Sequence, residues 1–353
     1  MTLSTPDPGA TLKADLLELL AQLPSLEHGK WVEQALIGIL RIAAEEIDRL
    51  DWKILTGSLQ DMERAFEIFS AYRHVRKISI FGSARLPSDA PAYQIALAFA
   101  RQVAQQGFMV MTGAGGGIMQ AGNEGAGLEQ SFGLNIQLPF EQGSNPFVTE
   151  DKLIQFKYFF TRKLFFLRET DAVALFPGGF GTQDEAFECL TLCQTGKAGP
   201  MPLVLLDQPG GQYWHGWQKY VQDHLLSQNL INGDDLSLYT ITDRVDVACQ
   251  AIAEFYRVYH SSRYVREQFV MRLKTELSDA EVEELNQEFR DILVSGRIEK
   301  TKALPEERLS DVHDLPRLVL HFNQRDHGRL YQMIHRINQM GQPSEAQNHP
   351  ERK

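Results

Sequence analysis

The sequence predicts an α/β protein with a doubly wound, Rossmann-like parallel sheet and helices on both of its faces. Short apolar runs bounded by turn residues alternate with amphipathic segments from about residue 77 to residue 259. Strands that alternate with helices pair in parallel through right-handed crossovers. Two of the apolar runs end directly in glycine-rich loops, at 113–117 and 177–181. Because ligands bind at the carboxyl ends of the strands in such sheets, the two loops are expected to meet there.

Each expected strand is a run of apolar residues too short for a helix, and each expected helix has apolar residues at a spacing near 3.6. The loop at 113–117 does not match G-x-G-x-x-G, so a dinucleotide fingerprint is not predicted. Strands are expected over 78–81, 108–112, 131–138, 172–176, 203–206 and 239–242, and helices over 93–106, from 118, over 156–168, from 186, from 213 and over 245–259.

Two further parts flank the sheet domain, which is predicted to span 75–260. Residues 1–74 are expected to form a helical extension, since apolar stripes at helical spacing run through them. Residues 261–340 read as a small α+β module of ferredoxin-like shape, and the polar tail 341–353 is expected to be disordered. The module's expected elements are a strand over 264–273, a helix over 279–293 with its N-cap at Ser278, strands over 298–304 and 315–322, and a helix over 326–338.

Composition limits the classes of partner. The formal charge of −11 argues against binding to nucleic acid or to anionic membranes, whereas a small anion held by local groups remains compatible. The chain has three cysteines, which cannot form a disulfide framework, and no apolar run of about 20 residues that could span a bilayer. Cys189 and Cys193 lack further metal ligands at zinc-like spacing and are interpreted as buried apolar residues. We therefore expect a cytoplasmic protein with neither a metal nor a cofactor.

The segment 171–185, DAVALFPGGFGTQDE, carries the main functional signal. It predicts a buried strand, a glycine loop with Gly178, Gly179 and Gly181, and the start of a helix. A helix N-terminus behind a glycine loop is a ready site for a phosphate, and Thr182 can cap the helix or bond the anion. Glu185 lies about one turn further on, within reach of whatever the phosphate is attached to. Alternatively, the glycines only form a tight turn and Glu185 caps its own helix.

Two basic residues lie side by side on the expected aromatic-rich helix, Arg162 and Lys163. Arg162 is either a surface ion pair or a partner of the acid at 185. Lys163 either helps to bind the phosphate or is a solvated residue of the helix. Ser83, in the Gly-Ser turn after the first strand, is a further candidate for the nucleotide site, or only a turn residue.

Taken together, these motifs resemble the LOG family of cytokinin-activating phosphoribohydrolases, whose members are often labelled lysine decarboxylases. The resemblance rests on FGSAR at 81–85, TGAGGGIM at 112–119, TRK at 161–163 and PGGFGTQDE at 177–185. It covers roughly residues 77–255 and is closer to the longer bacterial branch of the family. Phe159 and Phe160 stand where the family often has Met-His, which leaves the contacts to the base open.

The resemblance implies hydrolysis of the N-glycosidic bond of nucleoside 5′-monophosphates, such as AMP or a cytokinin riboside monophosphate, to a free base and ribose 5-phosphate. It makes Arg162 and Glu185 the catalytic pair and places the glycines of the 177–181 loop and Thr182 at the phosphate. Gly115, Gly116 and Gly117 would lie against the nucleotide. A carboxylate beside the ribose fits this chemistry, since cleavage of the C1′–N bond builds positive charge on the sugar.

Besides hydrolysis, one possibility is that the terminal domains form an interaction scaffold and the core merely binds. Lysine decarboxylation is rejected, because it needs pyridoxal phosphate and no lysine lies in a recognisable setting for that cofactor. A non-catalytic regulatory protein that senses AMP-like nucleotides in the same pocket is the alternative. In either case the resemblance and the Phe-rich helix indicate a homodimer or a larger even assembly.

Overall fold

The computed structural model describes residues 18, 21–137, 143–307 and 312–340. These residues form two compact units, one up to Gln60 and one from Asp61 onward. The long helix α3 (Arg49–Ser70) contributes residues to both units. The tail expected from residue 341 lies outside the described residues, as does the end of the third expected strand at Leu138.

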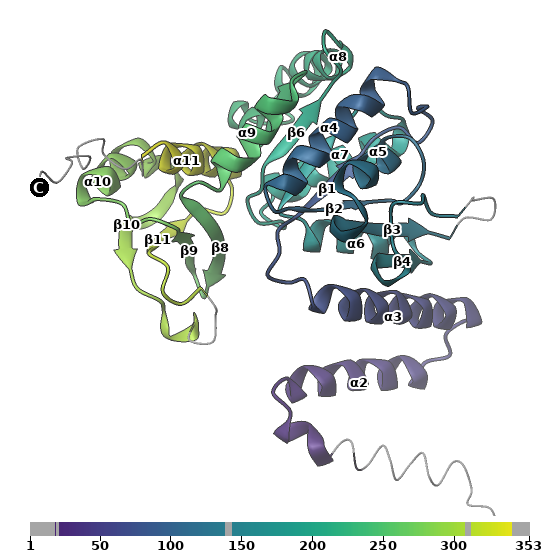
Figure 1. The fold of residues 1–353 in the computed structure, drawn as a ribbon. Helices are drawn as coiled ribbons and strands as arrows, with labels where there is room; N and C mark the ends of the chain where they lie inside the picture. Colours follow the sequence, from purple (N-terminus) through teal and green to yellow (C-terminus); the bar gives the residue numbers. More distant parts are fainter. Residues whose placement is uncertain (1–17, 19–20, 138–142, 308–311, 341–353) are drawn as a thin grey trace, which may run out of the picture. The chain divides into compact units, whose positions relative to one another are not determined.

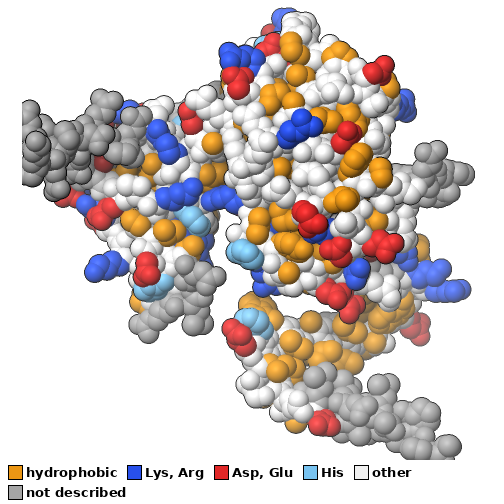
Figure 2. Space-filling view, in the orientation of Figure 1, with side chains coloured by type: hydrophobic (Ala, Val, Ile, Leu, Met, Phe, Trp, Pro, Cys, Tyr) orange, Lys and Arg blue, Asp and Glu red, His pale blue; other side chains and the backbone are white. Residues whose placement is uncertain are grey.

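The first unit is helical, as its apolar stripes predict. It contains the short turn η1 (Leu23–Ser25), the helix α2 (Gly29–Ala44) and the first half of α3. Several large apolar side chains of this unit are exposed, among them Trp31 at 69%, Leu40 at 59% and Leu50 at 64%. Figure 2 shows hydrophobic side chains gathered over α2 and α3.

The second unit contains the predicted parallel sheet, with seven strands in the order β4-β3-β2-β1-β5-β6-β7 (Figure 1). All neighbouring strands in it pair in parallel. The chain winds outward from β1 to β4 and then returns to place β5 beside β1, so the order reverses between β1 and β5. This is the place where doubly wound sheets bind ligands. The strands are β1 (Lys77–Phe81), β2 (Met109–Thr112), β3 (Ser131–Ile136), β4 (Leu153–Phe156), β5 (Ala172–Leu175), β6 (Leu203–Leu206) and β7 (Tyr239–Thr242).

Helices cover both faces of this sheet, which confirms the predicted fold class. On one face α4 (Pro91–Gln105) packs against α5 (Ile118–Ala126) and α9 (Val245–Phe255). On the other face α6 (Phe159–Glu169), α7 (Phe180–Gln194) and α8 (Tyr213–Tyr220) lie together. Short helical turns complete the chain at η2 (Leu128–Gln130), η3 (Glu150–Lys152), η4 (Val221–Leu226), η5 (Gly233–Leu238), η6 (Arg290–Ile292) and η7 (Pro305–Glu307).

The edge strand β4 was not expected, and the aromatic helix begins later than 156. The side chain of Asp61 explains the later start, because its carboxylate accepts hydrogen bonds from the backbone N–H groups of Lys157 (3.0 Å) and Tyr158 (3.2 Å). These bonds hold the residues before Phe159 in an extended conformation and cap α6 from outside. The helix therefore starts at Phe159.

The C-terminal part of the second unit is an antiparallel sheet with the strand order β10-β11-β9-β8. This is the strand order of a ferredoxin-like β-α-β-β-α-β fold in which the chain begins at the second strand, so that the first strand and the first helix come last. The single strand expected over 264–273 is wrong: Arg266 adopts a left-handed conformation (φ 54°) and turns the chain into a hairpin. The elements are β8 (Tyr259–Val265), β9 (Gln268–Leu273), α10 (Asp279–Glu288), β10 (Leu293–Thr301), β11 (Arg317–Phe322) and α11 (His327–Met340), with the expected capping box at Ser278.

The helix α11 of this module forms hydrogen bonds to the segment that follows α7. Tyr331 donates a hydrogen bond to the backbone oxygen of Met201 (3.0 Å) and accepts one from its N–H (3.0 Å). The His327 ring lies against Gly196, where a Cβ atom would stand 2.2 Å from the ring. Among the described residues, no helix is long and apolar enough to cross a membrane.

Candidate active site

Three loops meet at the point where the strand order reverses. They follow β1 (82–85), β2 (113–117) and β5 (177–181). Ser83 donates its N–H to the oxygen of Pro177 (3.1 Å), and its own oxygen accepts the N–H of Ile118 (2.9 Å). The turn after β1 therefore joins the other two loops through its backbone, and the expected convergence of the glycine loops is present.

The glycines at two positions are required by close approach. A Cβ atom on Gly178 would lie 2.1 Å from Thr182 Oγ1 and 3.0 Å from Ser83 N. Gly117 has φ +60°, and a Cβ atom there would lie 2.2 Å from the oxygen of Ser83. Any side chain at these positions would push the three loops apart.

The β5 loop ends in the N-terminus of α7, as predicted. Gly179 is the N-cap residue, and Thr182 is buried without capping the helix through its side chain. A Cβ atom on Gly179 or Gly181 would meet nothing within 4 Å, so the loop is open beside these residues. An open glycine loop at the positive end of a helix dipole is suited to an anion such as a phosphate.

The second glycine loop is held by a buried polar network. Thr112 Oγ1 donates to Asn123 Oδ1 (2.6 Å) and accepts the N–H of Ala114 (2.9 Å). Asn145 Nδ2 donates to the same Asn123 oxygen (3.0 Å) and to the backbone oxygen of Gly115 (3.1 Å). Ala114 is thereby kept in a left-handed conformation (φ 59°), which costs energy for a residue with a side chain. Gly115 and Gly116 thus belong to a rigid loop at the carboxyl end of β2.

Arg162 extends from α6 toward the second glycine loop. A Cβ atom on Gly113 would lie 2.6 Å from Arg162 Nη2, so the guanidinium packs directly on this glycine. Its centre also lies 5.4 Å from the ring centroid of Phe166. Arg162 is only partly exposed. The structure therefore favours a place in the site over a surface ion pair.

Glu185 is enclosed, with its side chain 13% exposed. Its Oε1 lies 3.3 Å from Lys163 Nζ, whereas its Oε2 is buried and accepts no hydrogen bond from the residues that the structure describes. Burial raises the pKa of Glu185 above its usual range, while Lys163 and, more weakly, Arg162 oppose the rise. A buried carboxylate oxygen with unused acceptor capacity is costly unless something else binds to it.

Lys163 bonds to carboxylates. Besides Glu185, its ammonium contacts Asp184 (2.9 Å) and Glu188 (2.6 Å), and its side chain is 17% exposed. The alternative of a solvated helix residue is therefore wrong, and its assignment to the phosphate stays a prediction. Although burial works against it, the three carboxylates raise the pKa of Lys163. The ammonium consequently stays charged and links α6 to the first turns of α7.

The predicted positions of the cysteines are confirmed, and no metal cluster stands out. Cys189 and Cys193 are buried in α7, where burial raises the pKa of both thiols. No group of His, Cys, Asp or Glu in the described ranges is arranged to hold a metal ion.

Residues 111–252 match the family model described as "Possible lysine decarboxylase". Residues 111–252 of the domain built on the seven-stranded sheet are thus similar to the LOG family, and this domain is called the LOG domain below. The match confirms the predicted resemblance, and it spans the two glycine loops, Arg162 and Glu185. The LOG fold supports a role in processing or binding nucleotides.

Solved structures similar to this chain align with about half of it. TM1055, a structural-genomics target, is 24% identical over 51% of this chain and 99% of its own, with a TM-score of 0.37. The molybdenum cofactor binding protein from Rippkaea orientalis is 22% identical over 50% and 93% (TM-score 0.34). The molybdenum cofactor carrier protein from Chlamydomonas reinhardtii is 19% identical over 51% and 97% (TM-score 0.35). Among curated proteins no match was found.

The description of the family names a decarboxylase, which would hold pyridoxal phosphate on a lysine. Lys163, the lysine beside the glycine loops of the LOG domain, does not fit this role. A Schiff-base lysine must lose its proton readily, whereas three carboxylates stabilise the charged form of Lys163. Its ammonium is also occupied by these bonds.

Proposed function

We propose that this protein hydrolyses the N-glycosidic bond of nucleoside 5′-monophosphates, with AMP or a modified AMP as the substrate. The proposal rests on the buried Oε2 of Glu185, which accepts no hydrogen bond within the described part of the chain and lies one turn behind an open glycine loop at a helix N-terminus. The loop would bind the 5′-phosphate and the carboxylate would face the ribose. The match of residues 111–252 to the LOG family model supports the same reaction class.

The reaction needs a water molecule and a stabilised sugar cation. As the C1′–N bond breaks, positive charge develops on C1′ and the ring oxygen, and the base leaves with the bonding electrons. The Glu185 carboxylate stabilises this charge and orients the water that adds to C1′. One proton of the water is left over and ends on the departing base, so the products are a neutral base and ribose 5-phosphate.

The phosphate supplies binding energy for this step, because its position in the loop fixes the ribose relative to Glu185. Arg162, packed on the second glycine loop, would contact the ribose hydroxyls or help to keep Glu185 ionised. No step requires a metal or a cofactor.

Release of ribose 5-phosphate from a panel of nucleoside monophosphates tests the proposal. The purified chain is incubated with AMP, GMP, CMP, UMP and an N6-substituted AMP, and both products are quantified. We expect equal amounts of base and ribose 5-phosphate from at least one nucleotide. Nucleotide binding without release of either product would instead support the regulatory, nucleotide-sensing alternative.

We also propose a homodimer or a larger even assembly, because apolar side chains are exposed around the candidate site. Phe180 is 96% exposed, and Phe159, Phe160 and Leu164 are each about half exposed. Apolar side chains gathered in this way are typical of subunit contacts. Light scattering at micromolar concentration should give a mass of two chains or more, and a monomer would contradict this.

A further inference from the structure

A cavity lies at the amino-terminal ends of β1 and β5, opposite the ends where the three loops meet. Its volume is about 300 Å³. Arg76 and Asp171, which directly precede β1 and β5, form one wall, and Lys197 to Met201, which follow α7, form another. The third wall is His260 to Ser262 of β8, in the C-terminal module. The cavity therefore lies between the LOG domain and this module.

The walls of this cavity carry an excess of positive charge in an acidic protein. Its charged lining residues are Arg76, Arg168, Lys197 and the single acid Asp171. Arg76 is fixed, since it bonds to Asp171 (3.4 Å) and to the oxygen of His260 (3.1 Å) and stacks on Tyr256 at 3.6 Å. Lys197 is exposed and forms no ion pair with any residue in the described ranges.

Part of this charge is compensated, because Glu169 pairs with Arg168, whereas the cations of Arg76, Lys274 and Arg272 gather around His260. Burial lowers the pKa of His260, and the cations of Arg76, Lys274 and Arg272 lower it further. The same burial and the charge of Arg76 lower the pKa of Lys274. A negatively charged ligand would relieve this repulsion among cations.

Hydroxyl groups of β8, which also bond to His260 and Tyr259, lie beside these cations. Ser261 and Ser262 line the cavity beside the cations. We propose that this cavity binds a small anion that carries phosphate groups, of about the size of pyrophosphate. Hydrogen bonds from guanidinium, ammonium and hydroxyl groups are the usual partners of such an anion.

The position of the cavity relates it to the candidate active site. Asp171 begins the segment β5–loop–α7 that carries Glu185, and Lys197 follows the end of the same segment. An anion bound between them would contact both ends of this segment and also β8. The site therefore links the module to the part of the LOG domain that holds the phosphate loop.

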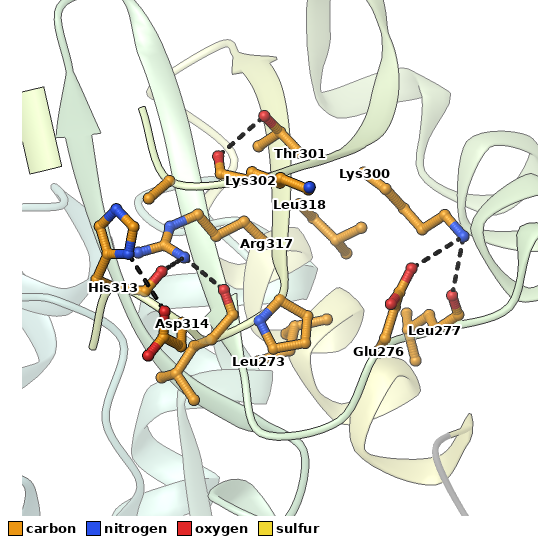
Figure 3. A pocket seen from close by; sticks show the side chains of 13 residues that line it. Leu273, Glu276, Leu277, Lys300, Thr301, Lys302, His313, Asp314, Arg317 and Leu318 are labelled. Carbon is orange, nitrogen blue, oxygen red and sulfur yellow. Dashed lines mark hydrogen bonds and ion pairs between the residues drawn. The ribbon is translucent and has the colours of Figure 1, made fainter. Parts of the chain in front are cut away.

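A larger cavity in the module, of about 720 Å³, is a weaker candidate (Figure 3). Two of its cations already have partners: Arg317 bonds to Glu307 and to backbone oxygens, and Lys300 bonds to Glu276 and Asp279. Lys302, whose exposed ammonium points into this cavity, supplies a matched control.

Calorimetric titration of the full chain with pyrophosphate, at constant ionic strength, tests the proposal. The variants are Lys197→Glu in the proposed cavity and Lys302→Glu in the larger one, each a charge reversal of an exposed lysine. Lys197→Glu should weaken one binding event by about tenfold or more, as expected when a charge-assisted bond to phosphate is lost. Lys302→Glu should bind like the wild type.

Circular dichroism melts of both variants establish that they are folded. A pyrophosphate bound in the glycine loops would be insensitive to Lys197→Glu, so an unchanged isotherm for this variant would overturn the proposal. The proposal would also be overturned if the wild type did not bind pyrophosphate at millimolar concentration, or if only Lys302→Glu lost binding. No turnover is measured, hence the result is independent of the proposed hydrolysis.

Discussion

The ion pair between Lys163 and Glu185 predicts how activity depends on pH. In the proposed hydrolysis Glu185 must be ionised to stabilise the sugar cation, so activity should fall as the pH falls through its pKa, which burial places above the ordinary 4.5. Lys163 opposes this rise from 3.3 Å. In Lys163→Gln the opposing charge is gone, the pKa of Glu185 rises further, and the acid limb of the pH–activity profile should move to higher pH.

The distance between the charges of Lys163 and Glu185 sets the size of the change in activity. Two unit charges 3.3 Å apart interact by about 1.3 kcal/mol in bulk water and by about 5 kcal/mol at an effective dielectric constant of about 20. The lower figure alone corresponds to about a tenfold loss of kcat/KM on the acid side of the profile. The loss should shrink toward higher pH, where Glu185 is ionised in both proteins.

The assay is the release of ribose 5-phosphate from AMP, measured as kcat/KM over a range of pH. Lys219→Gln is the matched control, because Lys219 forms an ion pair with Asp223 on the exposed surface of α8 and η4. This control should have the profile of the wild type. If the acid limb of Lys163→Gln coincides with that of the wild type, Glu185 is not the group that titrates.

Three further substitutions test the construction of the site. Gly178→Ala places a methyl group 2.1 Å from Thr182 Oγ1 and should lower stability by about 1–3 kcal/mol in a thermal melt, whereas Gly179→Ala, with open space around it, should be tolerated. Tyr213→Phe removes a hydrogen bond to the backbone oxygen of Gly178 (2.6 Å). It should lower stability by about 0.5–1.5 kcal/mol and raise KM for the nucleotide. An unchanged KM would show that the bond does not position the loop. Asp61→Ala removes the cap of α6 and should cost about 1.5–3 kcal/mol in chemical denaturation; a midpoint equal to that of the wild type would refute the capping role.

The sheet and its loops could be predicted because their signals are local. Each core strand is a run of buried residues, and the glycine loops directly follow the second and fifth strands. Their meeting follows from parallel pairing, which brings the carboxyl ends of neighbouring strands to one edge. The strand β4 gives a weaker signal, since Leu153 and Gln155 are not buried. The hairpin at Arg266 was missed because a left-handed arginine has no signature in the sequence.

The partners of Glu185 and the cap of α6 could not be predicted, because they depend on how distant segments pack. Asp61 lies 96 residues before Lys157, whose N–H it accepts. Lys163 meets Glu185 only because α6 and α7 lie side by side. One signal was available: Asp184 and Glu188 are four residues apart on α7, and an acidic helix face of this kind needs a nearby cation.

The central claim is that Glu185 carries out the chemistry while the glycine loop holds the phosphate. Glu185→Gln separates the two roles, since it removes the negative charge and keeps the shape of the side chain. AMP affinity and release of ribose 5-phosphate should be measured on the same preparations of this variant and the wild type. The account predicts that the variant binds AMP within a few-fold of the wild-type affinity and loses turnover by about a hundredfold or more. Turnover equal to that of the wild type would contradict it.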